Sequence, residues 1–116
     1  MYSTYIDRQD RKVLTLLINR VLLDGHLISV CDGEETVLDN CGDFEEITSA
    51  LNGTGEDWIN IIDSDSREVI TAFYCLYGEA DKSDPLELFA DYYCGEYPEA
   101  IIAYIEKGLT HPIAGN

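Results

Sequence analysis

The side chains of this sequence that could do chemistry are mainly carboxylates. The chain of 116 residues holds 23 aspartates and glutamates against seven lysines and arginines, a formal net charge of −16 at pH 7. The segment 21–66 carries twelve of the acids and no lysine or arginine. Because a surface of one sign repels itself, solvated surfaces normally mix both signs. We therefore interpret the missing bases of 21–66 as the main functional signal.

Carboxylates hold a metal ion only where their spacing builds a cage. Asp63-x-Asp65 resembles the opening of a calcium-binding loop. However, Arg67 occupies the third ligand position, and Glu68 occupies the sixth position, where such a loop needs glycine. A hairpin turn is the better interpretation of this segment. We expect no bound metal and no cofactor.

The other reactive side chains also lack the spacing of a catalytic or metal site. His26 and His111 have no metal-ligand spacing to a cysteine or to each other. The sequence contains no P-loop, no G-x-G-x-x-G and no G-x-S-x-G. Paired carboxylates for hydrolysis would need a cleft that separates their pKa values, and no sequence feature indicates one. We predict a protein that is not an enzyme and has no catalytic residues.

The four cysteines are expected to be reduced thiols, as in a reducing compartment. Cys31, Cys41, Cys75 and Cys94 form no C-x-x-C pair, and we expect thiols packed as small hydrophobes. A disulfide between Cys31 and Cys41 across a hairpin is the alternative. The N-terminal residues contain no apolar run for a signal peptide, and no segment is apolar enough to span a bilayer. We expect a cytoplasmic protein.

The first half of the chain predicts a helix followed by a hairpin. Apolar residues recur at spacings of three and four over 7–23, which is typical of an amphipathic helix that Gly25 ends. Two short strands, 27–32 and 36–39, then flank Asp32-Gly33, a dipeptide that closes tight hairpins. The hairpin tip is rich in acids.

The next elements repeat this order of one helix and two strands. After a predicted turn at 40–42, Asp43 can cap a short helix that ends at Asn52-Gly53. Strands are expected at 57–63 and 68–77. The second is apolar on both sides, and we predict that it is the most central strand of the sheet.

The last elements are a short strand and a helix. Residues 86–93 are compatible with a helix, but the flanking Asp84-Pro85 favours an edge strand. A helix starts near Pro98, at the position where proline is tolerated. Tight turns imply antiparallel pairing, and one-sided helices imply that they cover the sheet. We predict a single α+β domain over 1–116, with an antiparallel sheet of four to five strands and about three helices in the order α-β-β-α-β-β-(β)-α.

Tyrosine is frequent in the second half of the chain. Five of the eight tyrosines lie between Tyr74 and Tyr97. They can pack the sheet, or they can form a contact surface, because tyrosine offers a large area at low entropic cost. Since neighbouring residues of a strand point to opposite faces, one of Tyr92 and Tyr93 should be exposed.

Several segments together resemble a family of small acidic proteins encoded by phages and prophages. The resemblance covers about residues 14–105, and its most specific part is the hairpin. It implies an inhibitor of a host nucleic-acid-binding system, of the anti-CRISPR or anti-restriction type, and it carries over no catalytic residue. The segments are Ile28-Ser-Val-Cys-Asp-Gly-Glu-Glu35, 47–51, Glu56-Asp57, Tyr77-Gly78, Ala90-Asp91-Tyr92 and Glu99-Ala-Ile101.

These observations lead to one main hypothesis about function. The protein would bind a basic, nucleic-acid-binding host protein and occupy its phosphate-binding groove as an acidic mimic of DNA, because such grooves are built to meet a dense row of phosphates. It would act in the cytoplasm of an infected or lysogenic bacterial host, as a monomer or homodimer, without binding nucleic acid or a membrane. The expected partner-binding acids are Asp32, Glu34, Glu35, Asp39, Glu45, Glu46, Glu56, Asp57, Asp63 and Asp65.

Other functions remain open at this point. An immunity protein that neutralises a basic nuclease toxin would use the same charges. A regulatory or assembly domain would instead bind through the tyrosine-rich second half. The acidity could also serve only solubility or growth at high salt.

Overall fold

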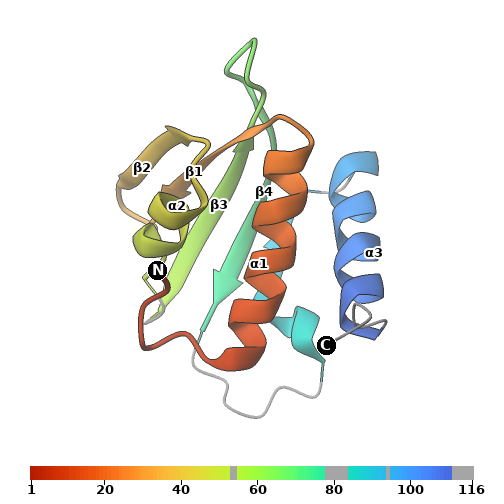
Figure 1. Ribbon diagram of the computed structural model, residues 1–116. Helices are drawn as coiled ribbons and strands as arrows, with labels where there is room; N and C mark the ends of the chain where they lie inside the picture. Colours follow the sequence, from red (N-terminus) through yellow and green to blue (C-terminus); the bar gives the residue numbers. More distant parts are fainter. Residues whose placement is uncertain (53–54, 78–83, 94, 111–116) are drawn as a thin grey trace.

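The computed structural model describes residues 1–52, 55–77, 84–93 and 95–110 (Figure 1). In these residues three α-helices pack against a five-stranded antiparallel sheet, so the predicted α+β class and order of elements are confirmed. The elements in chain order are α1 (Arg8–Leu23), β1 (Leu27–Cys31), β2 (Thr36–Cys41), α2 (Phe44–Ala50), β3 (Glu56–Ile62), β4 (Val69–Leu76), the 3₁₀ helix η1 (Pro85–Leu88), β5 (Phe89–Tyr92) and α3 (Glu96–Thr110).

The strands lie in the order β2-β1-β3-β4-β5, with β3 in the centre. The prediction that β4 is the most central strand is therefore wrong. Its two apolar sides suited a central position, but the position of a strand is decided by its partners. On one side β3 pairs with β4 through a local turn, and on the other it pairs with β1, with Val30 opposite Ile59. This second pairing is long-range, because β2 and α2 separate the two strands along the chain.

Local signals explain where the first helix and the hairpin begin and end. The Asp7 side chain caps α1 by accepting a hydrogen bond from the backbone N–H of Asp10 at 2.8 Å. Gly25 follows the helix with φ +84°, a conformation that glycine adopts without strain. At the hairpin tip the Asp32 carboxylate accepts two backbone N–H bonds. The predicted helix and hairpin are confirmed.

The segment after the hairpin differs from its prediction. We expected a turn at 40–42, but β2 continues through Cys41, which lies opposite Ile28. Asn40 absorbs the irregularity with φ 45° beside a bulge in the pairing. The chain then turns into α2, which Asp43 caps as predicted, by accepting a bond from the backbone N–H of Glu46 at 3.0 Å.

The ambiguous segment 86–93 divides into two parts. Its first part is the 3₁₀ turn η1, which Asp84 caps and in which Pro85 takes the first position. Its second part is the edge strand β5, so the predicted strand is confirmed only from Phe89 onward. A proline in the first turn of a helix is tolerated because its missing N–H would have no partner there.

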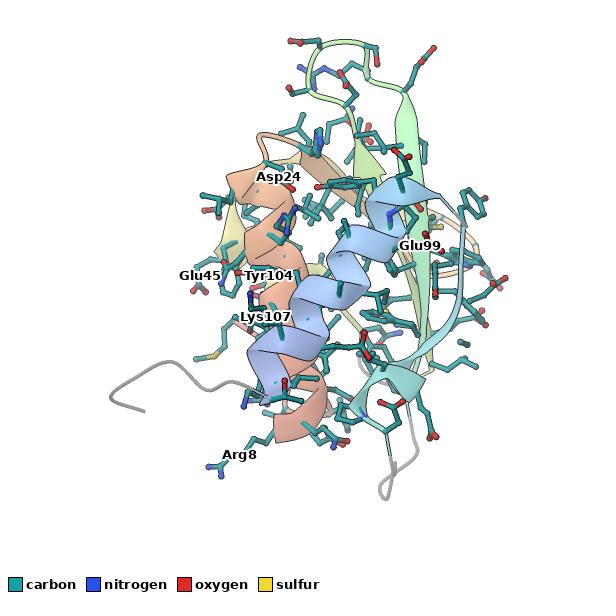
Figure 2. The ribbon with its side chains drawn as sticks, turned by 90° about the vertical axis from the view of Figure 1, so that its right-hand side faces the viewer. Arg8, Asp24, Glu45, Glu99, Tyr104 and Lys107 are labelled. Atoms are coloured by element: carbon teal, nitrogen blue, oxygen red, sulfur yellow. The ribbon has the colours of Figure 1, made fainter. Side chains whose placement is uncertain are left out.

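The helices and the core lie on one side of the sheet. Ile59 and Ile61 of β3, Val30 of β1 and Phe73 of β4 are fully buried there, and they share one hydrophobic cluster with residues of α1, α2 and α3. Figures 1 and 2 show all three helices on this side, and no other described element on the opposite side. We call the helices with their loops the helix layer. The five strands with their turns are the sheet layer.

Candidate partner-binding face

The side of the sheet that faces away from the helices carries a distinct set of side chains. Because side chains alternate along a strand, the neighbours of the buried residues point away from the core. None of the apolar members of this set packs against the core cluster. We call the set the open sheet face. It comprises Ser29, Cys31, Asp39, Glu56, Trp58, Asn60, Tyr74, Leu76, Asp91 and Tyr93.

Two stacked aromatic rings occupy the middle of the open sheet face. Trp58 of β3 lies opposite Tyr74 of β4, with ring centroids 4.5 Å apart and planes inclined by 27°. The Tyr74 hydroxyl donates a hydrogen bond to the Glu56 carboxylate two residues along β3. Such cross-strand pairs are a unit of sheet stabilisation. Trp58 and Tyr74 are both only half-buried, so part of their surface faces solvent.

Two carboxylates, of Glu56 and Asp91, flank the aromatic pair, and a third lies at the β2 edge of the same face. Asp39 on the edge strand β2 accepts a hydrogen bond from the Ser29 hydroxyl at 2.9 Å. Glu56 lies at the start of β3, and Asp91 of β5 stands directly opposite Tyr74. Tyr93 continues this edge, since its N–H donates to the Ala72 carbonyl, and its side chain is 58% exposed. The expectation that one of the two neighbouring tyrosines is exposed is thus confirmed.

Basic residues are divided unequally between the two layers. None of the five strands contains a lysine or arginine. In the described part of the chain these residues lie on α1, on α3 and, as Arg67, in the turn between β3 and β4. The open sheet face therefore combines aromatic rings and carboxylates without a positive charge among the residues described.

In the helix layer, two arginines lie over tyrosine rings and one of them pairs with a carboxylate. The Arg20 guanidinium lies 5.2 Å from the ring centre of Tyr104 on α3 and donates to the Asp24 carboxylate at 2.8 Å. Desolvation alone would raise the pKa of Asp24, but hydrogen bonds from Arg20 and Tyr97 outweigh it and hold that pKa below its usual value. A second arginine, Arg11, lies 5.9 Å from the ring centre of Tyr2.

Four of the predicted acids gather at one end of the sheet. Asp32, Glu34 and Glu35 form the tip of the β1–β2 hairpin, and Glu56 lies beside Gly33 of this tip. Two backbone N–H groups, of Glu35 and Glu34, bind the Asp32 carboxylate and lower its pKa. The need to bind these backbone N–H groups explains why residue 32 is an aspartate. The carboxylates of Glu34 and Glu35 are exposed and make no such bond within the tip.

Two further predicted acids lie at the opposite end of the sheet. Asp63 and Asp65 belong to the turn between β3 and β4. The Asp63 carboxylate accepts the backbone N–H groups of Ser66 and Asp65 at 2.9 and 2.8 Å, and these bonds lower its pKa. The two ends of the sheet are therefore both acidic, and the open sheet face lies between them.

The remaining predicted acids are not part of the sheet surface. Glu45 (labelled in Figure 2) and Glu46 lie in the first turn of α2. Glu45 pairs with the N-terminal amino group at 2.8 Å, and the Glu46 carboxylate contacts the Cys41 thiol. Asp57 is fully buried on the helix side of β3, and its carboxylate accepts the backbone N–H of Asn52 at 2.8 Å. Asp57 therefore cannot face a partner.

Asp57 belongs to a polar group in the interior of the protein. Asp10 of α1, Cys75 of β4 and Tyr77 lie near it. Burial raises the pKa of the Tyr77 hydroxyl, and the adjacent Cys75 and Asp57 raise it further. Burial likewise raises the pKa of the Cys75 thiol. These groups lie in the interior of the protein, away from the open sheet face.

The cysteines occupy separate environments. Cys31, Cys41 and Cys75 are free thiols. Cys31 and Cys41 lie at opposite ends of the β1–β2 pairing, opposite Thr36 and Ile28, so the alternative of a disulfide across the hairpin is wrong. The fourth predicted thiol, Cys94, lies outside the described residues.

The sequence interpretation missed Trp58, Tyr74 and Asp91 as site residues. The signal that could have found the first was alternation within β3, where Asp57, Ile59 and Ile61 share one side and Trp58 lies on the other. Asp91 could not be assigned in this way, because its strand was short and ambiguous.

The chain matches no protein-family model, no curated protein and no solved structure. Residues 1–52, 55–77, 84–93 and 95–110 contain no group of three or more metal-binding side chains. Within the same residues, no helix has both the length and the apolar character to cross a membrane.

Proposed function

We propose that this protein binds a basic, nucleic-acid-binding protein through its sheet layer. One observation carries the proposal: the five strands contain no lysine or arginine, whereas the helix layer mixes both signs. An acidic surface of this kind attracts basic proteins, repels nucleic acid and speeds encounter with its partner.

The acids that would meet the partner are those of the sheet layer. They include the hairpin tip, the open sheet face and the β3–β4 turn, which together span the length of the sheet. Duplex DNA presents one charge per about 1.7 Å of its axis, and a groove that accepts phosphates can accept carboxylates instead. The proposed partner-binding acids are Asp32, Glu34, Glu35, Asp39, Glu56, Asp63, Asp65 and Asp91.

The resemblance to small acidic phage and prophage proteins supplies the biological setting of the proposal. The partner would be a host defence complex that binds nucleic acid, such as a CRISPR or restriction complex, and the protein would inhibit it by occupying its DNA-binding groove. An immunity protein against a basic nuclease toxin would use the same surface, and the nature of the captured partner distinguishes the two.

Competition with DNA tests the proposal. Proteins captured from a bacterial lysate by the wild-type chain are purified and offered duplex DNA with increasing amounts of this protein, at low and at physiological salt. We expect mutually exclusive binding that weakens with salt, since exposed charges are screened over about 8 Å at physiological ionic strength.

Simultaneous binding of DNA and of this protein to the captured partner would contradict the mimicry. Binding that survives neutralisation of the sheet-layer acids but fails in Tyr93→Ala would favour the regulatory domain.

A further inference from the structure

We infer that the open sheet face receives an arginine-rich segment of the basic partner, with one guanidinium stacked on the Trp58–Tyr74 pair. The inference rests on the proposed function, because it names the contact by which the basic partner is held. It concerns a different feature, however. The proposed function needs only the negative field, whereas this contact needs aromatic surface at the middle of the sheet.

The geometry of the pair suits a flat cation. Trp58 and Tyr74 stack at 4.5 Å and present neighbouring rings, and a planar guanidinium stacks on aromatic faces better than a compact ammonium. The Tyr74 hydroxyl bond to Glu56 holds a carboxylate beside the rings, and Asp91 stands on the other side of Tyr74. A carboxylate offers about four lone-pair sites, so the bond from Tyr74 leaves Glu56 able to accept from a partner.

In the helix layer, two tyrosine rings are covered by arginines of the protein itself. Arg20 lies over Tyr104, and Arg11 lies over Tyr2. Among the described residues, no lysine or arginine lies over Trp58 or Tyr74, although the carboxylates of Glu56 and Asp91 flank them. The open sheet face thus has the anions and the rings of a cation-binding site, and a partner's arginine supplies the complementary charge.

Charge decides between this occupant and two others. Aromatic rings on an open sheet can stack nucleic-acid bases, but such surfaces combine the rings with positive charge that tracks the phosphates. The open sheet face has the opposite sign. A second copy of the chain would place Asp39, Glu56 and Asp91 against the same acids of the first copy, which like-charge repulsion opposes. A basic segment meets neither obstacle.

Trp58 permits a direct measurement, because it is the only tryptophan of the chain. The wild-type protein is titrated with an oligoarginine and with an oligolysine of equal length at physiological ionic strength, while tryptophan fluorescence is followed. We expect the oligoarginine to change the Trp58 emission at lower concentration than the oligolysine. Equal effects of both peptides would mean that charge alone is recognised, and would overturn the stacked contact.

Variants separate the stacked contact from the general field. With a labelled oligoarginine, we expect Trp58→Ala to weaken binding about 3- to 30-fold, the range of a cation–π contact, and Trp58→Phe to weaken it less. Asp91→Asn should also weaken binding. The matched control is Tyr104→Ala, which removes an aromatic ring that already has its own cation, and it should change the affinity by less than about twofold. Thermal unfolding of each variant verifies that it is folded.

The remaining outcomes distinguish failure of this contact from failure of the proposed function. Oligoarginine binding that is unchanged in a folded Trp58→Ala variant would overturn the contact and leave the proposed function standing. Absence of binding to either peptide would overturn both. A single-stranded oligonucleotide that changes Trp58 emission, or a wild-type dimer that Trp58→Ala dissociates, would assign the face to another occupant and overturn the inference.

Discussion

The two layers of this protein use the same kinds of side chain in opposite ways. In the helix layer, arginines cover tyrosine rings and pair with a carboxylate, as Arg20 does with Tyr104 and Asp24. On the open sheet face, aromatic rings and carboxylates stand together without a lysine or arginine among the described residues. The difference teaches that the acidity of the chain is not uniform. The strands have no lysine or arginine of their own, whereas the helices α1 and α3 do.

The largest expected effect separates the two sides of β4. Phe73 is fully buried in the core, whereas its neighbour Tyr74 lies on the open sheet face. We expect Phe73→Ala to lower the free energy of unfolding by about 3–5 kcal/mol, the usual cost of emptying a core site. Tyr74→Ala should lower it by only about 1–2 kcal/mol, through loss of the ring stack and part of its burial. Urea unfolding of both variants measures the difference, and equal losses would mean that the open sheet face is part of the core.

The second prediction compares two neighbouring acids of β3. Asp57→Ala removes a buried acceptor of the Asn52 N–H, and we expect it to lower the free energy of unfolding by about 1–3 kcal/mol. Glu56→Ala should change stability by less than about 1 kcal/mol and weaken binding of a basic peptide instead. Unfolding and binding titrations on both variants provide the test. If the two variants lost stability equally and both kept their affinity, the distinction between the two sides of the strand would be wrong.

The smallest expected effect concerns acid. The pKa of Asp63 is lowered in the folded protein by its backbone N–H bonds, so the unfolded chain takes up this proton at higher pH. The stabilisation is therefore fully present above the unfolded value near pH 4, and it is lost as the pH falls through the lower folded value. Asp63→Asn should reduce the loss of stability on acidification, followed by thermal unfolding between neutral and low pH. Asp65→Asn is the matched control, because Asp65 takes part in this turn through its backbone N–H, which the substitution retains. An equal reduction of the acid-induced loss of stability in Asp65→Asn would contradict the assignment to Asp63.

Local rules predicted most of the fold. The stripe of α1, the Asp32-Gly33 hairpin and the Asp43 cap depend on residues close together in the chain, and all three are confirmed. The central position of β3 depends on its pairing with β1 across the intervening β2 and α2, which no local pattern reports. The turn expected at 40–42 failed because a bulge at Asn40 extends β2.

The candidate site was predicted in part. Glu34, Glu35 and Asp39 lie on exposed parts of the sheet layer, as an acidic surface requires. Asp57 was assigned to that surface by charge alone, although alternation with Ile59 places it in the core. The aromatic pair joins residues of two strands, so its position became visible only with the register of β3 and β4.

The most direct test of the central claim compares two variants of equal net charge. Each loses three negative charges, but the charges are removed from different layers. One triple variant neutralises the sheet layer with Asp39→Asn, Glu56→Gln and Asp91→Asn. The other neutralises the helix layer with Glu45→Gln, Glu46→Gln and Glu106→Gln. Affinity for an oligoarginine at physiological ionic strength should fall at least about tenfold in the first variant and less than about threefold in the second, because close charge pairs contribute more than the general field. Equal losses in the two variants would show that only total charge matters, and would contradict a binding surface on the sheet.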